Sequence, residues 1–306
     1  MFKEKFQEGI ISARDFSRDD IEYILAKARK MITHEKNSEL LRGKILATLF
    51  FEPSTRTRLS FESAMHRLGG SVIGFSSGDV SSIKKGESIA DTIRTVENYS
   101  DGIVMRHPLE GAAKMASRFA KVPIINAGSG SGEHPTQALL DLLTITEEGL
   151  KLDGLNIGIM GDLKYGRTVH SLAVLLSNYE LNVYFISPKE LMLRNRDKEF
   201  LRQSQIKFKE ATQYRDILGI LDVLYITRIQ RERFADIEEY ERVKNFYVFT
   251  EEDLAHTKDE FKIMHPLPRI NEISPEIDNS HKAIYFKQTF YGIPMRKALL
   301  AELIAD

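Results

Sequence analysis

The chain has 306 residues, and its 43 Lys and Arg residues almost balance its 44 Asp and Glu residues, which leaves a formal net charge of −1. This balance provides no overall basic field for nucleic acid or an anionic membrane, so we expect neither partner, and any anion must be bound locally. The chain has no Cys, which excludes disulfides, thiolate zinc sites and cysteine nucleophiles, and its eight His residues are not paired at metal-ligand spacing, so we expect no metal.

The first 43 residues are expected to form a leading helix. Ile21, Ile24, Leu25 and Ala28 recur at helical spacing and form one apolar stripe. The segment begins with mixed charges and contains no hydrophobic signal core, which favours a cytoplasmic protein.

From residue 44 onward, short apolar runs alternate with amphipathic ones. In the first half, strand-like runs cover residues 45–51, 71–75, 102–105 and 122–126, and helix-like runs follow them. This alternation indicates βα units and a parallel sheet. Residues 135–150 predict a helix that leads into a second domain.

The same alternation restarts in the second half of the chain. Strands are predicted there over residues 155–160, 182–186, 206–208, 223–227 and 262–265. A helix is expected over residues 169–176 and a final one over 295–305, and the sequence alone does not decide which domain the final helix joins. We therefore predict an α/β fold with two doubly wound parallel-sheet domains flanking an active-site cleft.

Residues 50–58, FFEPSTRTR, form a turn between a predicted strand and a predicted helix. A helix N-terminus presents unpaired N–H groups and the positive end of the helix dipole, and here it also carries hydroxyl and guanidinium groups. Ser54 or Thr55 could be an ordinary helix cap. Capping does not account for Arg56, because a cation at this end opposes the dipole unless an anion joins it. We therefore interpret the turn as a phosphate cradle.

Further polar groups follow other predicted strands, at the edge where open α/β sheets bind ligands. Arg106, His134 and Gln137 do so in the first half, and Arg167 and Arg228 in the second. Arg binds carboxylate and phosphate bidentately, so two groups of Arg on two domains imply two anionic ligands or one long one. Each residue also has a plainer interpretation: Arg106 as a surface charge, His134 as a helix cap and Arg167 as a partner of a neighbouring carboxylate.

Two other segments invite a ligand-binding interpretation. The polar loop over residues 76–87 is typical of a mobile solvated loop, and the sharper alternative is a lid that brings Lys85 to an anion. Residues 158–162 end a predicted strand but lack the third glycine of a dinucleotide fingerprint, and the chain has no Gly-Lys-Ser/Thr loop. Both absences argue against NAD enzymes and P-loop NTPases.

Taken together, these residues resemble the transcarbamoylase family over nearly the whole chain. The resemblance is carried by residues 51–58 (FEPSTRTR), 84–87 (KKGE), 104–108 (VMRHP), 134–137 (HPTQ), 162–168 (DLKYGRT), 227–230 (TRIQ) and 265–268 (HPLP). The KKGE and HPLP segments discriminate within the family, since ornithine-specific members typically have a cysteine in the latter. The resemblance implies an enzyme of pyrimidine biosynthesis that transfers the carbamoyl group of carbamoyl phosphate to the amine of L-aspartate, with no cofactor.

The resemblance also implies roles for individual residues. The carbamoyl phosphate site would consist of Ser54, Thr55, Arg56, Thr57, Ser81, Lys85, Arg106, His134 and Gln137. The catalytic residues among them would be Arg56, Thr57, Lys85, Arg106 and His134, with Arg106 polarising the carbamoyl carbonyl. The aspartate site would consist of Lys85, Arg167, Arg228, Gln230 and the Leu267 backbone.

The family's assembly follows from the same resemblance. Residues 1–134 and the C-terminal helix 292–306 would form a carbamoyl-phosphate-binding domain, and residues 135–291 an aspartate-binding domain. Ser81 and Lys85 would enter the site of a neighbouring subunit, so we expect a homotrimer with shared active sites, and the resemblance favours the lid over an inert loop. A larger assembly with a regulatory chain stays open, as do two alternatives: a carbamoyltransferase for another amine such as ornithine, and a non-catalytic phosphometabolite-binding or assembly subunit.

Overall fold

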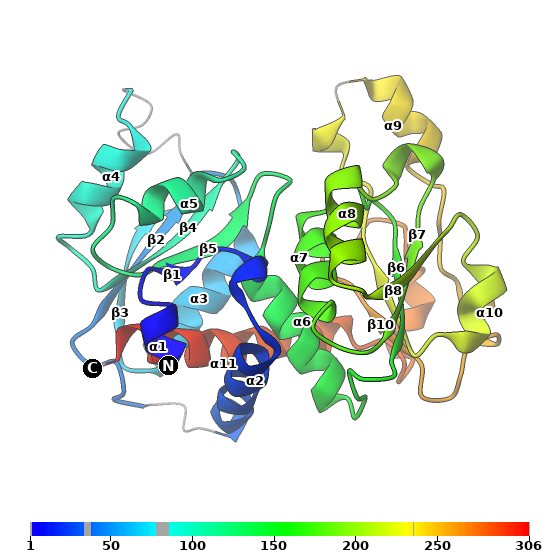
Figure 1. Cartoon of the computed structure of the whole chain (residues 1–306), viewed down its shortest axis with the longest axis horizontal. Helices are drawn as coiled ribbons and strands as arrows, with labels where there is room; N and C mark the ends of the chain where they lie inside the picture. The colour runs from blue at the N-terminus through cyan, green and yellow to red at the C-terminus, as the bar shows by residue number, and fades with distance from the viewer. Residues whose placement is uncertain (1, 34–37, 78–85, 235, 306) are drawn as a thin grey trace. The chain divides into compact units, whose positions relative to one another are not determined.

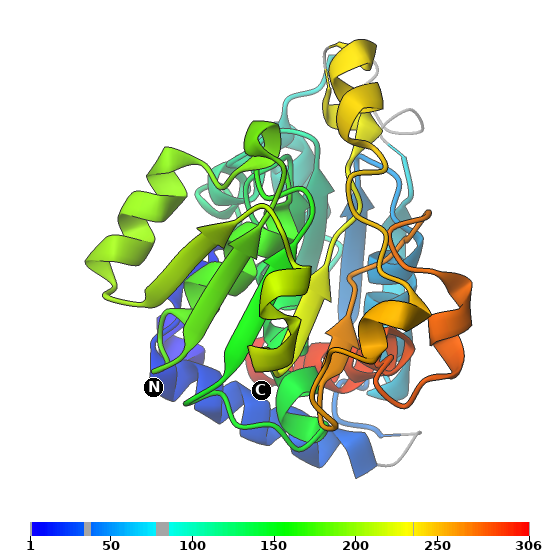
Figure 2. The same ribbon diagram turned by 90° about the vertical axis from the view of Figure 1, so that its right-hand side faces the viewer.

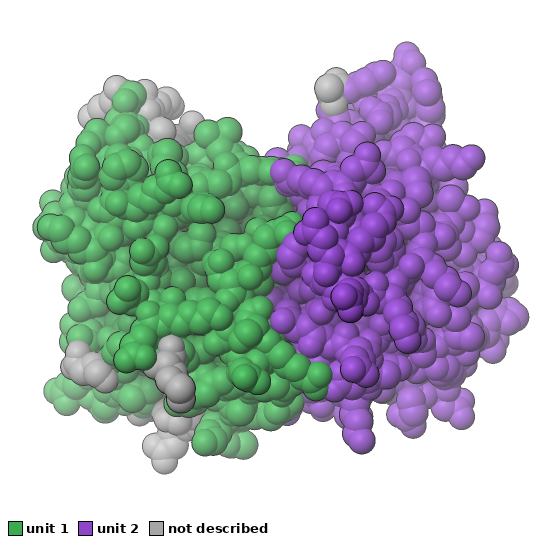
Figure 3. Space-filling view, viewed as in Figure 1, with its two compact units in different colours: residues 1–143, 290–306 green, residues 144–289 purple. Residues whose placement is uncertain are grey.

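The computed structural model of the chain describes residues 2–33, 38–77, 86–234 and 236–305. Two compact units make up the chain: unit 1 comprises Met1–Leu143 and Phe290–Asp306, and unit 2 comprises Thr144–Thr289 (Figures 1 and 3). Each unit is built on a five-stranded parallel sheet with helices between the strands, which confirms the predicted fold class.

The sheet of unit 1 has the strand order β1-β5-β4-β2-β3. Its strands are β1 (Gly9–Ile10), β2 (Ile45–Phe50), β3 (Ser71–Phe75), β4 (Gly102–His107) and β5 (Ile124–Ser129). The unit also contains α1 (Phe2–Lys5), α2 (Arg18–Thr33), α3 (Thr55–Arg67), α4 (Ile89–Val96) and α5 (Ala112–Ser117). Helices α6 (Pro135–Glu147) and α11 (Tyr285–Ile304) contain the boundaries between the two units.

Helices cover both faces of this sheet, which explains why its central strands are buried almost throughout rather than on one face. In β2, all residues except Ile45 are buried. Ala47 and Leu49 point to the face covered by α4 and α5, where they pack against Ile93 and Ala116. Figure 1 shows α3 on the opposite face, as right-handed crossover connections require.

The prediction of a single leading helix is wrong in part. Helix α2 buries the predicted stripe of Ile21, Ile24, Leu25 and Ala28, but the chain before it forms α1, strand β1 and a short 3₁₀ turn. The strand depends on Gly9, which has a φ of +110° and lies so close to β5 that a Cβ atom would be 1.9 Å from the carbonyl oxygen of Ile124. Glycine tolerates both conditions, and the chain can therefore add an edge strand to the sheet.

The sheet of unit 2 has the strand order β10-β9-β6-β7-β8. Its strands are β6 (Asn156–Met160), β7 (Asn182–Ile186), β8 (Lys207–Ala211), β9 (Val223–Ile226) and β10 (Lys262–Met264). The helices between them are α7 (Arg167–Leu176), α8 (Asn195–Gln203), α9 (Ile237–Val243) and α10 (Glu251–Leu254), with 3₁₀ turns at Lys189–Leu191, Arg215–Ile220, Arg231–Arg233 and Pro275–Asn279. Figure 2 shows these strands, coloured from green to orange, side by side and running in one direction.

The final helix is longer than predicted. The predicted helix covers residues 295–305 and starts directly after Pro294, and proline usually ends or kinks a helix. In the structure α11 begins at Tyr285 and continues through Pro294 to Ile304. Tertiary packing therefore overrides the local signal, since Tyr285 and Gln288, which precede Pro294, are buried as Met295 is after it.

Candidate active site

Each unit has one position where consecutive crossover connections leave in opposite directions, and open α/β sheets bind ligands at this point. In unit 1 it lies between β2 and β4, which pair with Phe50 opposite Arg106. In unit 2 it lies between β6 and β9, which pair with Met160 opposite Ile226. Most of the polar residues predicted at strand ends follow these strands, and the others follow the neighbouring strands β5 and β10.

In unit 1, Arg106 ties the ends of the two central strands together. Its backbone carbonyl accepts a hydrogen bond from the N–H of Phe51 over 2.9 Å. Its Nε donates to Oε1 of Glu52 over 2.8 Å, and its Nη1 donates to the hydroxyl of Ser54 over 3.1 Å. The guanidinium is only 16% exposed, and two acceptors therefore fix its orientation.

The N-terminus of α3 lies directly beside this arginine. Ser54 is the N-cap residue by position, but its side chain makes no capping hydrogen bond and serves Arg106 instead. Thr55 and Arg56 are exposed in the first turn of the helix, which contains no acidic residue. The first turn thus combines unpaired N–H groups, the positive helix dipole and a cation, and this arrangement suits an anion.

His134 joins the same group from the start of α6. Its ring is buried between two hydroxyls, with Nε2 3.5 Å from Oγ1 of Thr57 and Nδ1 3.5 Å from Oγ1 of Thr136. One helical turn later, Nε2 of Gln137 donates to Oδ1 of the buried Asp141 over 2.9 Å, which orients the Gln137 amide. Gln137 thus lies in the first turn of α6, three residues after His134.

In unit 2, Asp162 holds the loops that follow β6 and β9. Its backbone N–H donates to Oγ1 of Thr227 over 3.1 Å, and its Oδ1 accepts from the N–H of Tyr165 over 2.9 Å. Burial raises the pKa of Asp162 to about 6, against hydrogen bonds from backbone N–H groups that lower it. Within the described residues, its Oδ2 has no hydrogen-bond partner.

The predicted aspartate ligands follow three strands of this sheet. Arg167 is the first residue of α7, and Arg228 follows β9 and donates from Nη1 to Oε2 of Glu232 over 3.1 Å. Burial raises the pKa of Glu232, but the hydrogen bond and charge of Arg228, a backbone hydrogen bond and the charge of Arg233 together outweigh it, and the net pKa is lowered. Gln230 lies two residues further along the same loop, and Leu267 follows the neighbouring strand β10.

Of the predicted site residues, unit 1 contains Ser54, Thr55, Arg56, Thr57, Arg106, His134 and Gln137, and unit 2 contains Arg167, Arg228, Gln230 and Leu267. The structure brings Arg106 together with Ser54, and Thr57 with His134. Ser81 and Lys85 lie outside the described residues. The pairing of Glu52 with Arg106 was not expected from the sequence, because it joins two strand ends that are 54 residues apart. No group of three or more His, Asp or Glu side chains suited to a metal occurs in the described part of the chain. Nor does any helix within it have the length and apolar character needed to cross a membrane.

Comparisons with known proteins cover both units. The family described as "Aspartate/ornithine carbamoyltransferase, carbamoyl-P binding domain" matches residues 9–147, and "Aspartate/ornithine carbamoyltransferase, Asp/Orn binding domain" matches residues 153–303. The aspartate carbamoyltransferase catalytic subunit of Thermococcus gammatolerans is 59% identical over 95% of this chain and 96% of its own length. That of Methanothrix thermoacetophila is 52% identical over 97% of this chain and 98% of its own.

Solved structures agree with these matches. The catalytic subunit of M. jannaschii aspartate transcarbamoylase has a TM-score of 0.88 at 53% identity and covers 97% of this chain and 98% of its own. Aspartate transcarbamoylase from Trypanosoma cruzi, in complex with carbamoyl phosphate and aspartate, has a TM-score of 0.94 at 40% identity, with 99% of each chain covered. The chain therefore belongs to the aspartate/ornithine carbamoyltransferase family.

Proposed function

We propose that this chain transfers the carbamoyl group of carbamoyl phosphate to the amine of L-aspartate, which gives N-carbamoyl-L-aspartate and phosphate. The observation that carries the proposal is the match of nearly the whole chain, at 52% to 59% identity, to aspartate carbamoyltransferase catalytic subunits. The T. cruzi relative, crystallised with carbamoyl phosphate and aspartate, supports the same pair of substrates. This reaction is a step of pyrimidine biosynthesis.

Unit 1 binds carbamoyl phosphate in this proposal. The first turn of α3 supplies N–H groups, hydroxyls and the guanidinium of Arg56 to the phosphate, which carries two negative charges to match them. Arg106, Thr57 and His134 surround the carbamoyl carbonyl oxygen. The Gln137 amide, oriented by Asp141, binds the carbamoyl NH₂ group.

In the proposed reaction the aspartate amine is the nucleophile, so the protein's main task is to stabilise the negative charge that develops on the carbonyl oxygen. The aspartate nitrogen attacks the carbamoyl carbon, and negative charge grows on the carbonyl oxygen as the tetrahedral species forms. Arg106 is already oriented by Glu52 and Ser54, so it stabilises that charge with little reorganisation. The carbon–oxygen bond to phosphate then breaks, the phosphate leaves with the electron pair, and the proton lost by the nitrogen passes to the departing phosphate.

Unit 2 binds aspartate. Arg167, Arg228 and Gln230 hold the two carboxylates, and the Leu267 backbone contacts the reacting amine. Two carboxylates need two cationic partners, which the loops after β6 and β9 supply. Ser81 and Lys85 complete the site from a neighbouring subunit of a homotrimer, and the protein acts in the cytoplasm.

Carbamoylation assays with purified protein test the function directly. With carbamoyl phosphate present, L-aspartate is expected to be carbamoylated, whereas ornithine and other amino acids are expected to give no product above the uncatalysed rate. Turnover of ornithine without turnover of aspartate would overturn the substrate assignment. Absence of any carbamoylation, from protein that binds carbamoyl phosphate, would favour a non-catalytic subunit.

A further inference from the structure

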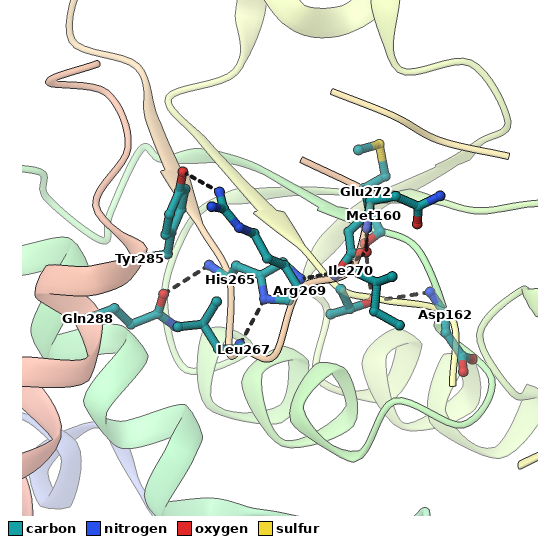
Figure 4. A network of polar contacts seen from close by, with 11 residues as sticks. Met160, Asp162, His265, Leu267, Arg269, Ile270, Glu272, Tyr285 and Gln288 are labelled. Atoms are coloured by element: carbon teal, nitrogen blue, oxygen red, sulfur yellow. Dashed lines mark hydrogen bonds and ion pairs between the residues drawn. The ribbon is translucent and has the colours of Figure 1, made fainter. Parts of the chain in front are cut away.

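The turn formed by residues 265–268 follows strand β10 at the ligand-binding edge of the unit 2 sheet (Figure 4). Within it, Leu267 has a φ of +56°, a left-handed conformation that residues other than glycine rarely adopt. Such a conformation persists only where the surroundings hold it. Leu267 is half-buried, and no described residue donates a hydrogen bond to its carbonyl oxygen.

His265 is the residue that holds this turn. Its Nδ1 accepts a hydrogen bond from the backbone N–H of Leu267 over 2.8 Å, so Nδ1 carries no proton. Its Nε2 lies 2.7 Å from Oε1 of Glu272, and a carboxylate accepts at this distance only from a protonated nitrogen. The two contacts together select the Nε2–H tautomer (Figure 4).

Other groups fix Glu272 and the backbone of His265. The second oxygen of Glu272 accepts from the N–H groups of Ile270 and Asn271, each over 3.1 Å. The backbone N–H of His265 donates to Oε1 of Gln288 over 2.9 Å. Glu272 therefore has acceptor contacts on both oxygens and cannot move away from the imidazole without losing them.

The charges around the ring favour its neutral form. Burial lowers the pKa of His265, Glu272 raises it, and the guanidinium groups of Arg269 and Arg228 lower it further, so that the net pKa is below the usual value. Arg228 is one of the predicted aspartate ligands and follows the adjacent strand β9. The turn and the carboxylate-binding arginine are thus neighbours in unit 2.

We propose that His265, with its tautomer selected by Glu272, is a positioning residue that holds the Leu267 backbone in the conformation in which it contacts the amino acid substrate. This inference rests on the proposed function, which places aspartate against Leu267. His265 has no contact with substrate in this scheme. It acts through the Leu267 N–H alone, and Glu272 acts through His265.

Two substitutions of His265 separate its two hydrogen bonds. In His265→Asn, the amide oxygen lies close to the position of Nδ1 and can accept from Leu267, whereas in His265→Gln the longer side chain reaches Glu272 instead. We expect His265→Gln to raise the KM for aspartate and lower kcat/KM at least tenfold, while the dissociation constant of carbamoyl phosphate stays within twofold. His265→Asn is expected to recover most of that loss.

Asn271→Ala is the matched control, because Asn271 is exposed in the same segment and its side chain hydrogen-bonds to Asn245, away from His265, while its backbone N–H remains. This variant is expected to leave the KM for aspartate and the dissociation constant of carbamoyl phosphate unchanged. Equal losses in His265→Asn and His265→Gln, or a parallel loss of carbamoyl phosphate binding, would overturn the proposal, because either result indicates a general structural role.

The tautomer itself is measurable without any assay. In protein labelled with ¹⁵N at histidine, the resonances assigned by comparison with His265→Asn are expected to show a protonated Nε2 and an unprotonated Nδ1. Glu272→Gln is expected to shift this ratio toward the other tautomer and to raise the KM for aspartate. A protonated Nδ1 in the unmodified protein would overturn the proposal even if the His265 variants do not fold. Failure of the proposed function is distinguishable, because the unmodified protein would then not carbamoylate aspartate.

Discussion

Arg106 donates a hydrogen bond to the hydroxyl of Ser54, although Ser54 occupies the N-cap position of α3. The serine therefore orients a guanidinium instead of capping a helix. This contact ties the end of β4 to the turn after β2, and it places a fixed positive charge beside the unpaired N–H groups of α3.

Replacing Arg106 tests its role in the transition state. Arg106→Ala is expected to lower kcat by about a hundredfold to a thousandfold, the range seen when an oxyanion donor is lost. Arg106→Lys should recover little, because one ammonium group cannot reproduce the planar fork that reaches both Glu52 and Ser54. Arg67→Ala, at the other end of α3, is the control. Steady-state kinetics with normal turnover in Arg106→Ala would remove this residue from the mechanism.

Ser54→Ala separates binding from stability. Ser54 makes no capping bond but accepts a hydrogen bond from the mostly buried Arg106, so we expect its loss to lower the free energy of unfolding by about 1 to 2 kcal/mol through that contact. Ser88→Ala is the matched comparison: Ser88 caps α4 by accepting from the N–H of Asp91 over 3.1 Å, and its loss should cost about 1 kcal/mol. Urea unfolding measures both. Binding of carbamoyl phosphate should weaken in Ser54→Ala alone, and unchanged binding in that variant would contradict this account.

Because of Asp162, the free energy of unfolding is expected to depend on pH. Its pKa is about 6 in the folded chain against an ordinary value of 3.8, so the folded state binds the proton more tightly than the unfolded state. The stabilisation is therefore complete below about pH 4 and is lost as the pH rises through 6, and it amounts to roughly 3 kcal/mol. Asp162→Asn removes the titration. The unfolding free energy of the unmodified protein, measured relative to that of Asp162→Asn, should fall between pH 4 and 7, and a constant difference would contradict the assignment.

Replacing Arg296 tests the contribution of a charge buried between α11 and α3. The side chain lies buried on α11, donates to the hydroxyl of Ser60 over 2.6 Å and covers the ring of Phe61 at 4.8 Å. Arg296→Met should reduce the free energy of unfolding by about 3 to 5 kcal/mol, because the buried carboxylate of Asp141 loses a compensating cation.

The control for Arg296 is on the same helix. Lys287→Met breaks only an ion pair with Glu148, in which the lysine side chain is 62% exposed, and it should cost at most about 1 kcal/mol. Both values come from urea unfolding. Similar losses in the two variants would show that burial of Arg296 contributes nothing specific.

Mixing two inactive variants tests the shared active site. Lys85→Ala and Arg56→Ala are each expected to be nearly inactive, since each removes one cation from the proposed anion site. If Lys85 serves a neighbouring subunit, then trimers reassembled from both variants contain some sites with neither substitution, and activity returns. Reassembly without any activity would place Lys85 in the site of its own subunit.

The sequence by itself determined the two parallel sheets and the strand ends at which the polar residues lie. Both follow from local signals: alternating apolar runs and helical periodicity specify βα units, and the carboxyl ends of parallel strands share one edge. Sequence patterns were therefore sufficient to locate the hydroxyl and arginine residues after β2, β4, β6 and β9. The family resemblance then gave each of them an expected role.

The tertiary structure alone decided how those residues are held. Gly9 adds a strand to β5, Arg106 takes the Ser54 hydroxyl that the sequence offered as one possible cap of α3, and Glu272 selects the tautomer of His265. None of these pairings has a periodic or compositional signal, because each joins groups that only strand order and loop paths bring within hydrogen-bonding distance. Local patterns specify elements, whereas the partners of buried polar groups depend on which elements meet.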